Sequence, residues 1–390
     1  MDTGLHRFLT ENEPGMFDLL KEQVCIQSGT GNKAGVDRVG GAISKALDGL
    51  PLTCSTICQD RYGDHLVFST PAAECNNGKK GKQNILITGH MDTVFPEDTD
   101  FNGYHEDSDR VYGPGVIDMK GGLVTTIFAV KALAASGHLA DLPIVLFFNS
   151  DEEMGSPSSI PVLKELAISA CCGLVTECGG VKGEVVTGRR GKCGYRLNIA
   201  GRAGHAAFAG RSKASSILEL AHKTIALEAL NDLKSGLVVN VGKVEGGIGP
   251  NTVAEHAVAL IDTRYSNEAD GISLRQKIEQ ICKKQVQERT ATSLSITNER
   301  PVMEPSTGNK KLFRIFKNQA DRLKIPLLEE FRAGVSDANT LAGTGLAVLD
   351  GLGPVGEHDH SSKEYMIKES LPQRCRLLAS SILELADLSI

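Results

Sequence analysis

Four short apolar runs constrain the fold of this chain more than any other feature. They occupy residues 85–87, 144–148, 174–175 and 346–349. Each is too short for a buried helix, and each is typical of a strand that is buried on both faces. Helix-like stretches follow the first two runs, at residues 120–136 and 158–168. Strands that alternate with helices predict an α/β fold with a mostly parallel sheet.

A different pattern begins near residue 192. Apolar residues alternate with polar ones at Tyr195, Leu197 and Ile199, as in a strand with one buried face. The pattern then predicts, in order, a helix at 212–231, strands at 237–244 and 253–263, a helix at 273–287 and a strand at 293–297. This order of elements is typical of a ferredoxin-like α+β domain.

The ferredoxin-like segment interrupts the larger domain, because the α/β pattern resumes at Lys310. A chain of 390 residues has room for two or three domains. We therefore expect a discontinuous catalytic domain, residues 1–190 and 303–390, and an inserted domain, residues 191–302.

Composition excludes several kinds of partner. The 42 basic and 48 acidic residues give a net charge of −6 without a long block of either sign, which argues against nucleic acid. No apolar run approaches the ~18 residues of a membrane span. The ten cysteines are scattered, and the first 15 residues lack the apolar segment of a signal peptide. These features predict a cytoplasmic protein that binds neither nucleic acid nor membrane.

Acidic residues and histidines follow the apolar runs. They are His90 and Asp92 after the first run, Glu152 and Glu153 after the second, Glu177 after the third, His360 after the fourth, and Asp118 at the start of the helix at 120–136. Ligands of open parallel sheets bind beyond the carboxyl ends of the strands, so these side chains should converge on one crevice.

Such a cluster predicts a metal site. Carboxylates in one crevice repel one another unless a cation neutralises them. Nitrogen and oxygen ligands without cysteine fit zinc, cobalt or manganese. Two ions about 3.5–4 Å apart would need a bridging carboxylate, for which Asp118 is the candidate.

The segments that carry these residues resemble one enzyme family. Residues 89–94, 113–122, 151–156 and 360–365 are together similar to the dinuclear zinc amidohydrolases, which include glutamate carboxypeptidase, acetylornithine deacetylase, succinyl-diaminopimelate desuccinylase and aminoacylase. The resemblance implies a zinc-peptidase-like, three-layer catalytic domain. It also implies that the inserted domain serves as a lid and dimerisation domain, so we expect a homodimer.

The resemblance further implies the roles of individual residues. His90 and Glu177 would bind one divalent ion, Glu153 and His360 would bind the other, and Asp118 would bridge the two. Zinc is the expected metal, with cobalt and manganese as alternatives. Glu152 would be the general base, and a cis peptide bond would follow Asp118.

Asp92 and His358 lie close in sequence to the two histidine ligands that the resemblance implies. Asp92 lies two residues after His90 and is placed to accept the second ring N–H of that histidine. His358 competes with His360 as the metal ligand, and we favour His360 because Ser361 and the pair Glu364 and Tyr365 follow it at the spacing of the family.

The inserted domain carries a second signature at residues 201–207. By resemblance, His205 would stabilise the oxyanion of the transition state, although it could also be an ordinary surface histidine. Asn251 and Arg300 resemble positions that hold the carboxylate of the substrate, and an arginine at a domain boundary could instead be a structural ion-pair partner. Residues 334–339 match a loop that lines the cleft in the family.

These observations predict a metal-dependent hydrolase that cleaves an amide bond, in a peptide or an N-acyl amino acid, next to a free carboxylate. The expected mechanism uses a metal-bridging hydroxide, and the residues around Arg300 resemble the glutamate carboxypeptidase branch most. The alternatives are an N-acyl-amino-acid deacylase or a dipeptidase and, outside enzymes, a degenerate binding or scaffold protein.

Overall fold

The computed structural model describes residues 3–76, 84–208, 210, 213–232 and 234–387. The chain forms two compact units. Unit 1 comprises Met1–Gly188, Pro305–Arg332 and Ser336–Ile390, and unit 2 comprises Arg189–Glu304 and Ala333–Val335.

A six-stranded sheet forms the centre of unit 1. Its order is β1 (Thr53–Ile57), β2 (His65–Ser69), β6 (Ile144–Asn149), β3 (Asn84–His90), β7 (Ala170–Val175) and β16 (Ala347–Leu349). The last four strands are parallel neighbours, whereas β2 pairs antiparallel with both β1 and β6. The four apolar runs therefore form the parallel strands, as predicted. The antiparallel edge was not predicted, because β1 is exposed along most of its length and lacks an apolar run.

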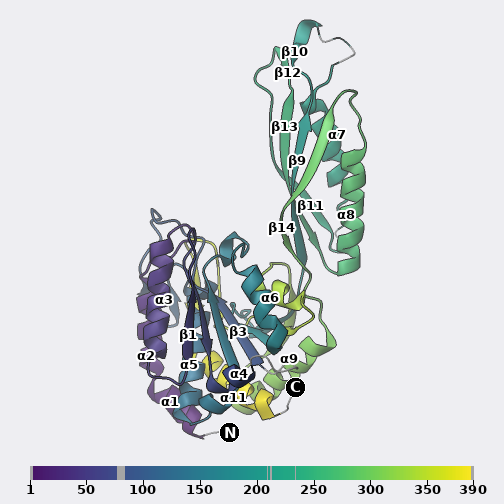
Figure 1. Ribbon diagram of the computed structural model, residues 1–390. Coiled ribbons are helices and arrows are strands. Elements are labelled where there is room, and N and C mark those ends of the chain that lie inside the picture. The colour runs from purple at the N-terminus through teal and green to yellow at the C-terminus, as the bar shows by residue number, and fades with distance from the viewer. Residues whose placement is uncertain (1–2, 77–83, 209, 211–212, 233, 388–390) are drawn as a thin grey trace. The chain divides into compact units, whose positions relative to one another are not determined.

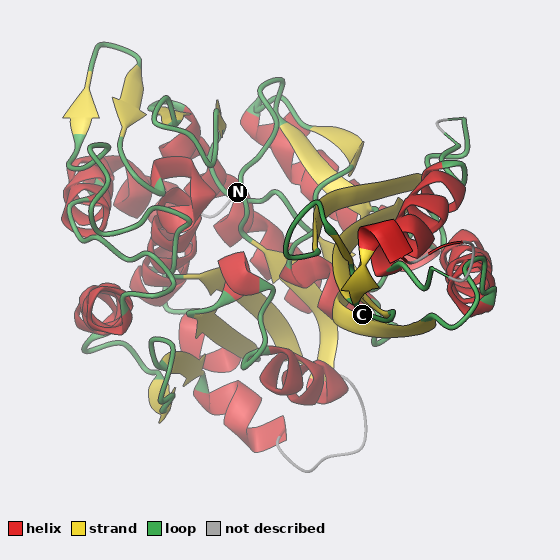
Figure 2. Ribbon diagram, turned by 90° about the horizontal axis from the view of Figure 1, so that it is seen from above, coloured by secondary structure: helices red, strands yellow, loops and turns green. Residues whose placement is uncertain are grey.

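Helices cover both faces of this sheet, so unit 1 has three layers. The helices are α1 (Thr3–Glu11), α2 (Glu13–Val24), α3 (Lys33–Leu47), α4 (Pro71–Asn76), α5 (Gly121–Ala135), α6 (Ile160–Ser169), α9 (Thr307–Leu323), α10 (Asp337–Ala342) and α11 (Ser370–Asp387). α5 contacts β3 and is surrounded by α1, α2, α3 and α11, while α6 and α10 pack on β7. Figure 1 shows α3 and α6 on opposite sides of the strands, and Figure 2 shows helices on both sides of the sheet.

The strand β6 explains why both layers of helices are needed. Alternate side chains of a strand point to opposite faces of the sheet. Ile144, Leu146 and Phe148 join the main hydrophobic core, which also contains Leu123 and Ile127 of α5. All six residues of β6 are nevertheless buried, so its other face is covered as well. Burial on both faces is the reason that this strand is a continuous apolar run.

A small antiparallel sheet joins two loops that are far apart in the sequence. Its order is β17 (Gly356–Glu357), β18 (Tyr365–Ile367), β5 (Arg110–Tyr112) and β4 (His105–Glu106). The pairing of β18 with β5 brings the segment that precedes β18 beside the segment that follows β5. A further two-stranded sheet pairs β8 (Glu184–Arg189) with β15 (Leu328–Arg332).

Unit 2 has the predicted ferredoxin-like order of elements. It runs β9 (Gly191–Ala200), β10 (Gly204–His205), α7 (Ser216–Glu228), β11 (Val238–Gly246), β12 (Thr252–Val253), β13 (His256–Tyr265), α8 (Glu268–Lys283) and β14 (Ala291–Arg300). The main sheet is antiparallel in the order β11, β13, β9, β14, and β10 pairs with β12.

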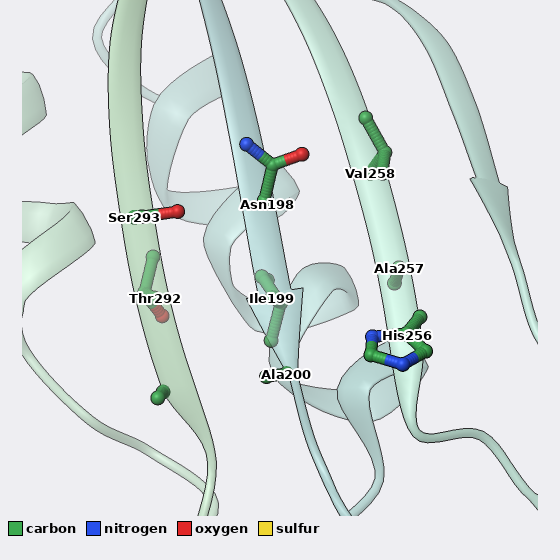
Figure 3. Close-up of a pocket in the computed structure, with 9 residues that line it drawn as sticks. Asn198, Ile199, Ala200, His256, Ala257, Val258, Thr292 and Ser293 are labelled. Carbon is green, nitrogen blue, oxygen red and sulfur yellow. The ribbon is translucent and has the colours of Figure 1, made fainter.

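The two faces of the unit 2 sheet differ in what packs against them. Tyr195, Leu197 and Ile199 pack with residues of α7 and α8 in the core of the unit. Side chains between them point away from the helices, and Figure 3 shows Asn198 of β9 between Val258 of β13 and Ser293 of β14 along a depression on this face.

The boundaries of α8 differ from the expected range of 273–287. The helix begins five residues earlier because the side chain of Asn267 accepts the N–H of Asp270 and caps it. It ends at Lys283. The carboxylate of Glu219 then accepts the N–H groups of Val286 and Gln287, which stabilises a non-helical turn.

A buried ion pair links α7 to that turn. The Nζ of Lys223 lies 3.0 Å from a carboxylate oxygen of Glu219, and it also donates to the carbonyl groups of Ile281 and Lys284. Burial by itself would raise the pKa of Glu219, but the N–H of Gln287 and the ammonium of Lys223 lower it below its ordinary value of 4.5. The ionised carboxylate therefore stabilises the fold.

The Glu219→Gln variant should unfold more easily at neutral pH, by about 2–4 kcal/mol, because it leaves a buried ammonium without its counter-charge. The contribution of Glu219 is present above pH 4.5 and is lost as the pH falls through its lowered pKa in the folded state. Denaturant unfolding at pH 7 and at acidic pH should therefore show a difference from the parent protein that shrinks in acid. Glu255→Gln, at an exposed position, is the control, and equal stability of both variants at pH 7 would contradict the prediction.

In the part of the chain that the structure describes, no helix combines the length and the apolar character required to cross a membrane.

Candidate metal centre

The carboxyl ends of the parallel strands place the predicted ligands together. His90 is the last residue of β3, and Glu177 lies two residues after the end of β7. Glu153 follows β6 in a short 3-10 turn, η3 (Glu152–Met154). Because β6, β3 and β7 are parallel neighbours, these three side chains leave the same edge of the sheet.

Among the described residues, the potential metal ligands form two groups that share one carboxylate. Asp118 and His90 form the first group with Glu177, and Asp118 and His360 form the second with Glu153. The Nε2 of His90 lies 3.0 Å from Oδ1 of Asp118, and the Nε2 of His360 lies 3.0 Å from Oδ2 of the same residue. Each carboxylate oxygen of Asp118 thus faces a different group, as a bridging ligand requires.

The electrostatics of the cluster fit a bound cation. Burial and the charge of Asp118 raise the pKa of Glu153 to about 7, and the same two causes raise the pKa of Glu177 well above its ordinary range. Oε1 of Glu153 is buried and has no hydrogen-bond partner among the described residues. Burying an unpaired carboxylate oxygen is costly, and a divalent cation would remove that cost.

The two histidines respond to the same carboxylates. Hydrogen bonds to Asp118 and Glu153 raise the pKa of His360 to about 11. Although burial would lower the pKa of His90, its contacts with Asp118 and Asp92 raise it well above the ordinary value. Burial would raise the pKa of Asp118, but the hydrogen bonds from His360 and His90 hold it below its usual range.

Asp92 supports the cluster in a way that differs in part from the prediction. The Nδ1 of His90 lies 2.9 Å from the main-chain oxygen of Asp92 and 3.4 Å from its carboxylate. A carbonyl oxygen only accepts, so Nδ1 carries the proton, and Nε2 of a neutral ring is left for a metal. The carboxylate of Asp92 mainly accepts other hydrogen bonds, from the N–H groups of Glu152 and Glu153 and from the hydroxyl of Thr30.

Glu152 lies beside the two ligand groups and belongs to neither of them. Its N–H is held by Asp92, and its neighbour Glu153 belongs to the second group. Of these two adjacent residues of η3, Glu153 could thus bind a metal, and Glu152 could act on a substrate.

His358 lies outside both ligand groups. Its ring packs edge-on against Tyr365, with 5.9 Å between the ring centres. Of the two candidates in this loop, the geometry therefore favours His360.

Glu364 supports the loop that carries Asp118 and was not singled out as a functional residue. Its side chain accepts the N–H groups of Gly115, Ile117 and Asp118 at 3.0, 2.8 and 3.1 Å. Burial outweighs these hydrogen bonds and raises the pKa of Glu364 to about 8. The expected cis peptide bond between Asp118 and Met119 is present in the same loop. Glu364 follows His360 by four residues, so it links the loops of two potential ligands.

The Glu364→Gln variant should bind metal about 10–100-fold more weakly, because an amide offers one accepting oxygen where the carboxyl group offers two. Titration of the metal-free variant with zinc, followed by calorimetry, would measure this loss. Glu357→Gln is the matched control, since that exposed carboxylate bonds to the hydroxyl of Tyr365 and not to the Asp118 loop. Metal affinity within twofold of the parent would show that Glu364 does not support the site.

The remaining predicted residues lie in unit 2. His205 and Thr252 are paired across β10 and β12, and the main-chain oxygen of Asn251 accepts the N–H of Ala206. His205 and Asn251 are therefore neighbours, and both are exposed. Arg300 is buried at the far end of β14, where it pairs with Lys192. Lys192 lies eight positions before Ala200 on β9, roughly 26 Å away at 3.3 Å per residue. Ala200 is at the end of β9 that leads into β10 and its partner β12, beside Asn251, so unit 2 does not bring Arg300 and Asn251 together.

Comparison with known proteins identifies relatives along almost the whole chain. Residues 86–384 match the model of peptidase family M20/M25/M40. Carboxypeptidase G2 from Pseudomonas sp. (strain RS-16) is 27% identical and covers 98% of this chain and 92% of its own. N-acetyl-L-citrulline deacetylase from Xanthomonas campestris pv. campestris is 31% identical over 50% of this chain and 54% of its own. The crystal structure of aminopeptidase PepT from Bacillus cereus covers 96% of this chain and 99% of its own, with 23% identity and a TM-score of 0.76, which shows the shared fold.

Proposed function

The chain belongs to peptidase family M20/M25/M40, whose members are metal-dependent peptidases and deacylases that act on C–N bonds, and from this we propose that it cleaves an amide bond next to a free carboxylate. The observation that carries the proposal is the arrangement of Asp118, whose two oxygens face two separate ligand groups beside Glu152. Such a site suits hydrolysis of a peptide or an N-acyl amino acid.

In this proposal, His90, Glu177 and Asp118 hold one divalent ion, and Asp118, Glu153 and His360 hold the second. Zinc suits the nitrogen and oxygen ligands, and cobalt or manganese are alternatives. When bound, the metal pair polarises the scissile carbonyl group and lowers the pKa of the attacking water.

Glu152 then acts as the general base. It takes the proton of the attacking water and delivers it to the leaving nitrogen, so that one carboxylate serves both halves of the reaction. Asp92 supports this role because it accepts the N–H groups of Glu152 and Glu153 and so fixes the turn that carries them.

His205 is proposed to donate a hydrogen bond to the oxyanion that develops during attack. Its exposure on the short ribbon of β10 and β12 leaves the ring accessible to a substrate. Asn251, its neighbour on that ribbon, is proposed to contact the carboxylate of the substrate. Arg300 was expected to share this role, but its burial at the other end of unit 2 favours the alternative interpretation, a structural ion-pair partner. Unit 2, residues 191–302 in our expectation, is proposed to serve as the lid and as the surface through which two copies of the chain form a dimer.

The substrate is proposed to be of the glutamate carboxypeptidase type. The support is the match to carboxypeptidase G2 over 98% of this chain, against 50% for the citrulline deacetylase. An N-acyl-amino-acid deacylase is the second candidate, because a citrulline deacetylase and an aminoacylase match as well. A dipeptidase is the other alternative.

A substrate panel would separate these candidates. The zinc-loaded and cobalt-loaded proteins should be assayed with N-benzoyl-glutamate, N-acetyl amino acids and dipeptides, and the released amino acid should be quantified. We expect the highest kcat/KM for release of glutamate from N-benzoyl-glutamate. A preference for N-acetyl amino acids or for dipeptides would favour the second candidate, and no hydrolysis of any of them would contradict the proposal.

A further inference from the structure

A carboxylate from a remote part of the chain holds both ends of the segment that carries Glu152 and Glu153. Nδ2 of Asn149, at the end of β6, lies 2.6 Å from Oδ2 of Asp337. The hydroxyl of Ser156, after the turn η3, lies 2.5 Å from Oδ1 of the same residue. Asn149, Ser156 and Asp337 are 1%, 0% and 4% exposed, so water does not compete for these hydrogen bonds.

Asp337 is itself held firmly in unit 1. It is the first residue of α10, and the preceding Ser336 caps this helix through the N–H of Ala338. The hydroxyl of Ser336 also donates to Asp350, the residue that follows β16, at 2.7 Å. α10 packs against α6, β7 and β16. Asp337 therefore projects from an element that is also held by contacts outside the turn, to Asp350, β7 and β16.

The turn needs such support because its exit is strained. Ser156 has φ of +57°, in the left-handed region that residues other than glycine rarely adopt. A conformation of this kind persists only where the surroundings determine it. The hydroxyl of Ser156 is bound by Asp337, and its N–H donates to the carbonyl group of Asp151 at 2.8 Å.

We propose that Asp337 is a positioning residue, which fixes both ends of the segment from Asn149 to Ser156 and thereby sets the positions of Glu152 and Glu153. It acts through the hydrogen bonds to Asn149 and Ser156 and not through contact with a substrate. The effect on turnover rests on the proposed function, in which Glu152 is the base and Glu153 a metal ligand. The effect on the order of the segment does not.

The Asp337→Ala variant tests this inference with two independent readouts. Hydrogen exchange of the amides from Glu152 to Gly155 should become about tenfold faster or more. In the zinc-loaded protein, kcat should fall by about 10–100-fold while KM changes less than about threefold, because a misplaced base affects the reaction more than substrate binding.

Thr70→Val is the matched control. The hydroxyl of Thr70 donates to the carbonyl group of Leu142 at 2.6 Å and accepts the N–H of Ile144 at 3.0 Å, so it holds the opposite end of β6. Thr70→Val should lower the melting temperature about as much as Asp337→Ala does. The hydrogen exchange of residues 152–155 and the kcat of Thr70→Val should nevertheless stay within about twofold of the parent values.

Ser156→Ala keeps the inference testable if Asp337→Ala does not fold, since it removes one of the two hydrogen bonds and should give an intermediate increase in exchange. Unchanged exchange in a folded Asp337→Ala or Ser156→Ala protein would overturn the inference. If the parent protein hydrolyses nothing on the substrate panel and exchange is still faster in Asp337→Ala than in the parent, the positioning role is upheld and the proposed function alone is contradicted.

Discussion

The Glu152→Gln variant should lose nearly all hydrolytic activity, with kcat about 10³–10⁴-fold below that of the parent protein. An amide of the same size cannot accept the proton of the attacking water, and it cannot return a proton to the leaving nitrogen. KM should change little, because Glu152 is assigned no role in binding the substrate. Steady-state kinetics on the best substrate of the panel would measure both constants.

The same variant should keep its metal and its fold. Glu152 belongs to neither ligand group, and the hydrogen bond from its N–H to Asp92 does not involve the side chain. Metal content by elemental analysis and the melting temperature should therefore match those of the parent. Glu165→Gln, at an exposed position on α6, is the control for loss of a carboxylate. Residual activity above a tenth of the parent value would contradict the role of Glu152.

The Asp118→Asn variant should lose the ability to hold two metal ions. Asp118 is the residue that the two ligand groups share, and each of its oxygens lies 3.0 Å from a different histidine. An amide has one oxygen and no charge, so at most one ion would keep all three of its proposed ligands, the other would keep two, and the bridging charge would be absent. We expect the metal content to fall to one ion or fewer per chain, and turnover to fall with it.

Thermal unfolding with added zinc gives a readout for this variant that does not depend on activity. A ligand that binds only the folded state stabilises it by about 2.7 kcal/mol at a free concentration of 100 Kd. The parent should show this stabilisation and Asp118→Asn should lack most of it. His358→Gln is the control, because His358 lies in neither ligand group and should keep the full response. Two metal ions per chain and a normal zinc response in Asp118→Asn would exclude the bridging role.

The fold was predictable where burial leaves a pattern in the sequence. β3, β6, β7 and β16 are buried strands, and their apolar runs indicated both their type and their parallel arrangement. The opposite case is β1, whose residues are exposed and which therefore carries no such pattern. The capped start of α8 was also missed, because the signal is a single asparagine side chain that precedes the apolar positions of the helix.

The candidate site was predictable for a related reason. A residue at the end of a parallel strand is placed by the strand itself, so the position of His90 or Glu177 along the chain indicates its position in space. The residues that support the site are not placed by the end of a strand. Glu364 and Asp337 act through hydrogen bonds to residues 249 and 181 positions away, Gly115 and Ser156. The resemblance marked the segments that carry them, but the local sequence did not indicate which N–H and hydroxyl groups these two carboxyl groups bind.

The sequence by itself therefore determined the buried parallel strands of unit 1, the order of the main elements of unit 2, and which side chains with metal-binding chemistry stand at the ends of the strands. These properties depend on the local pattern of burial and on the chemistry of each residue. Only the tertiary structure decided that the two oxygens of Asp118 face different groups, and that Asp92, Glu364 and Asp337 fix the loops around them. Those contacts join segments that are distant in the chain, and their partners and directions are set only when the sheet and its loops are packed together.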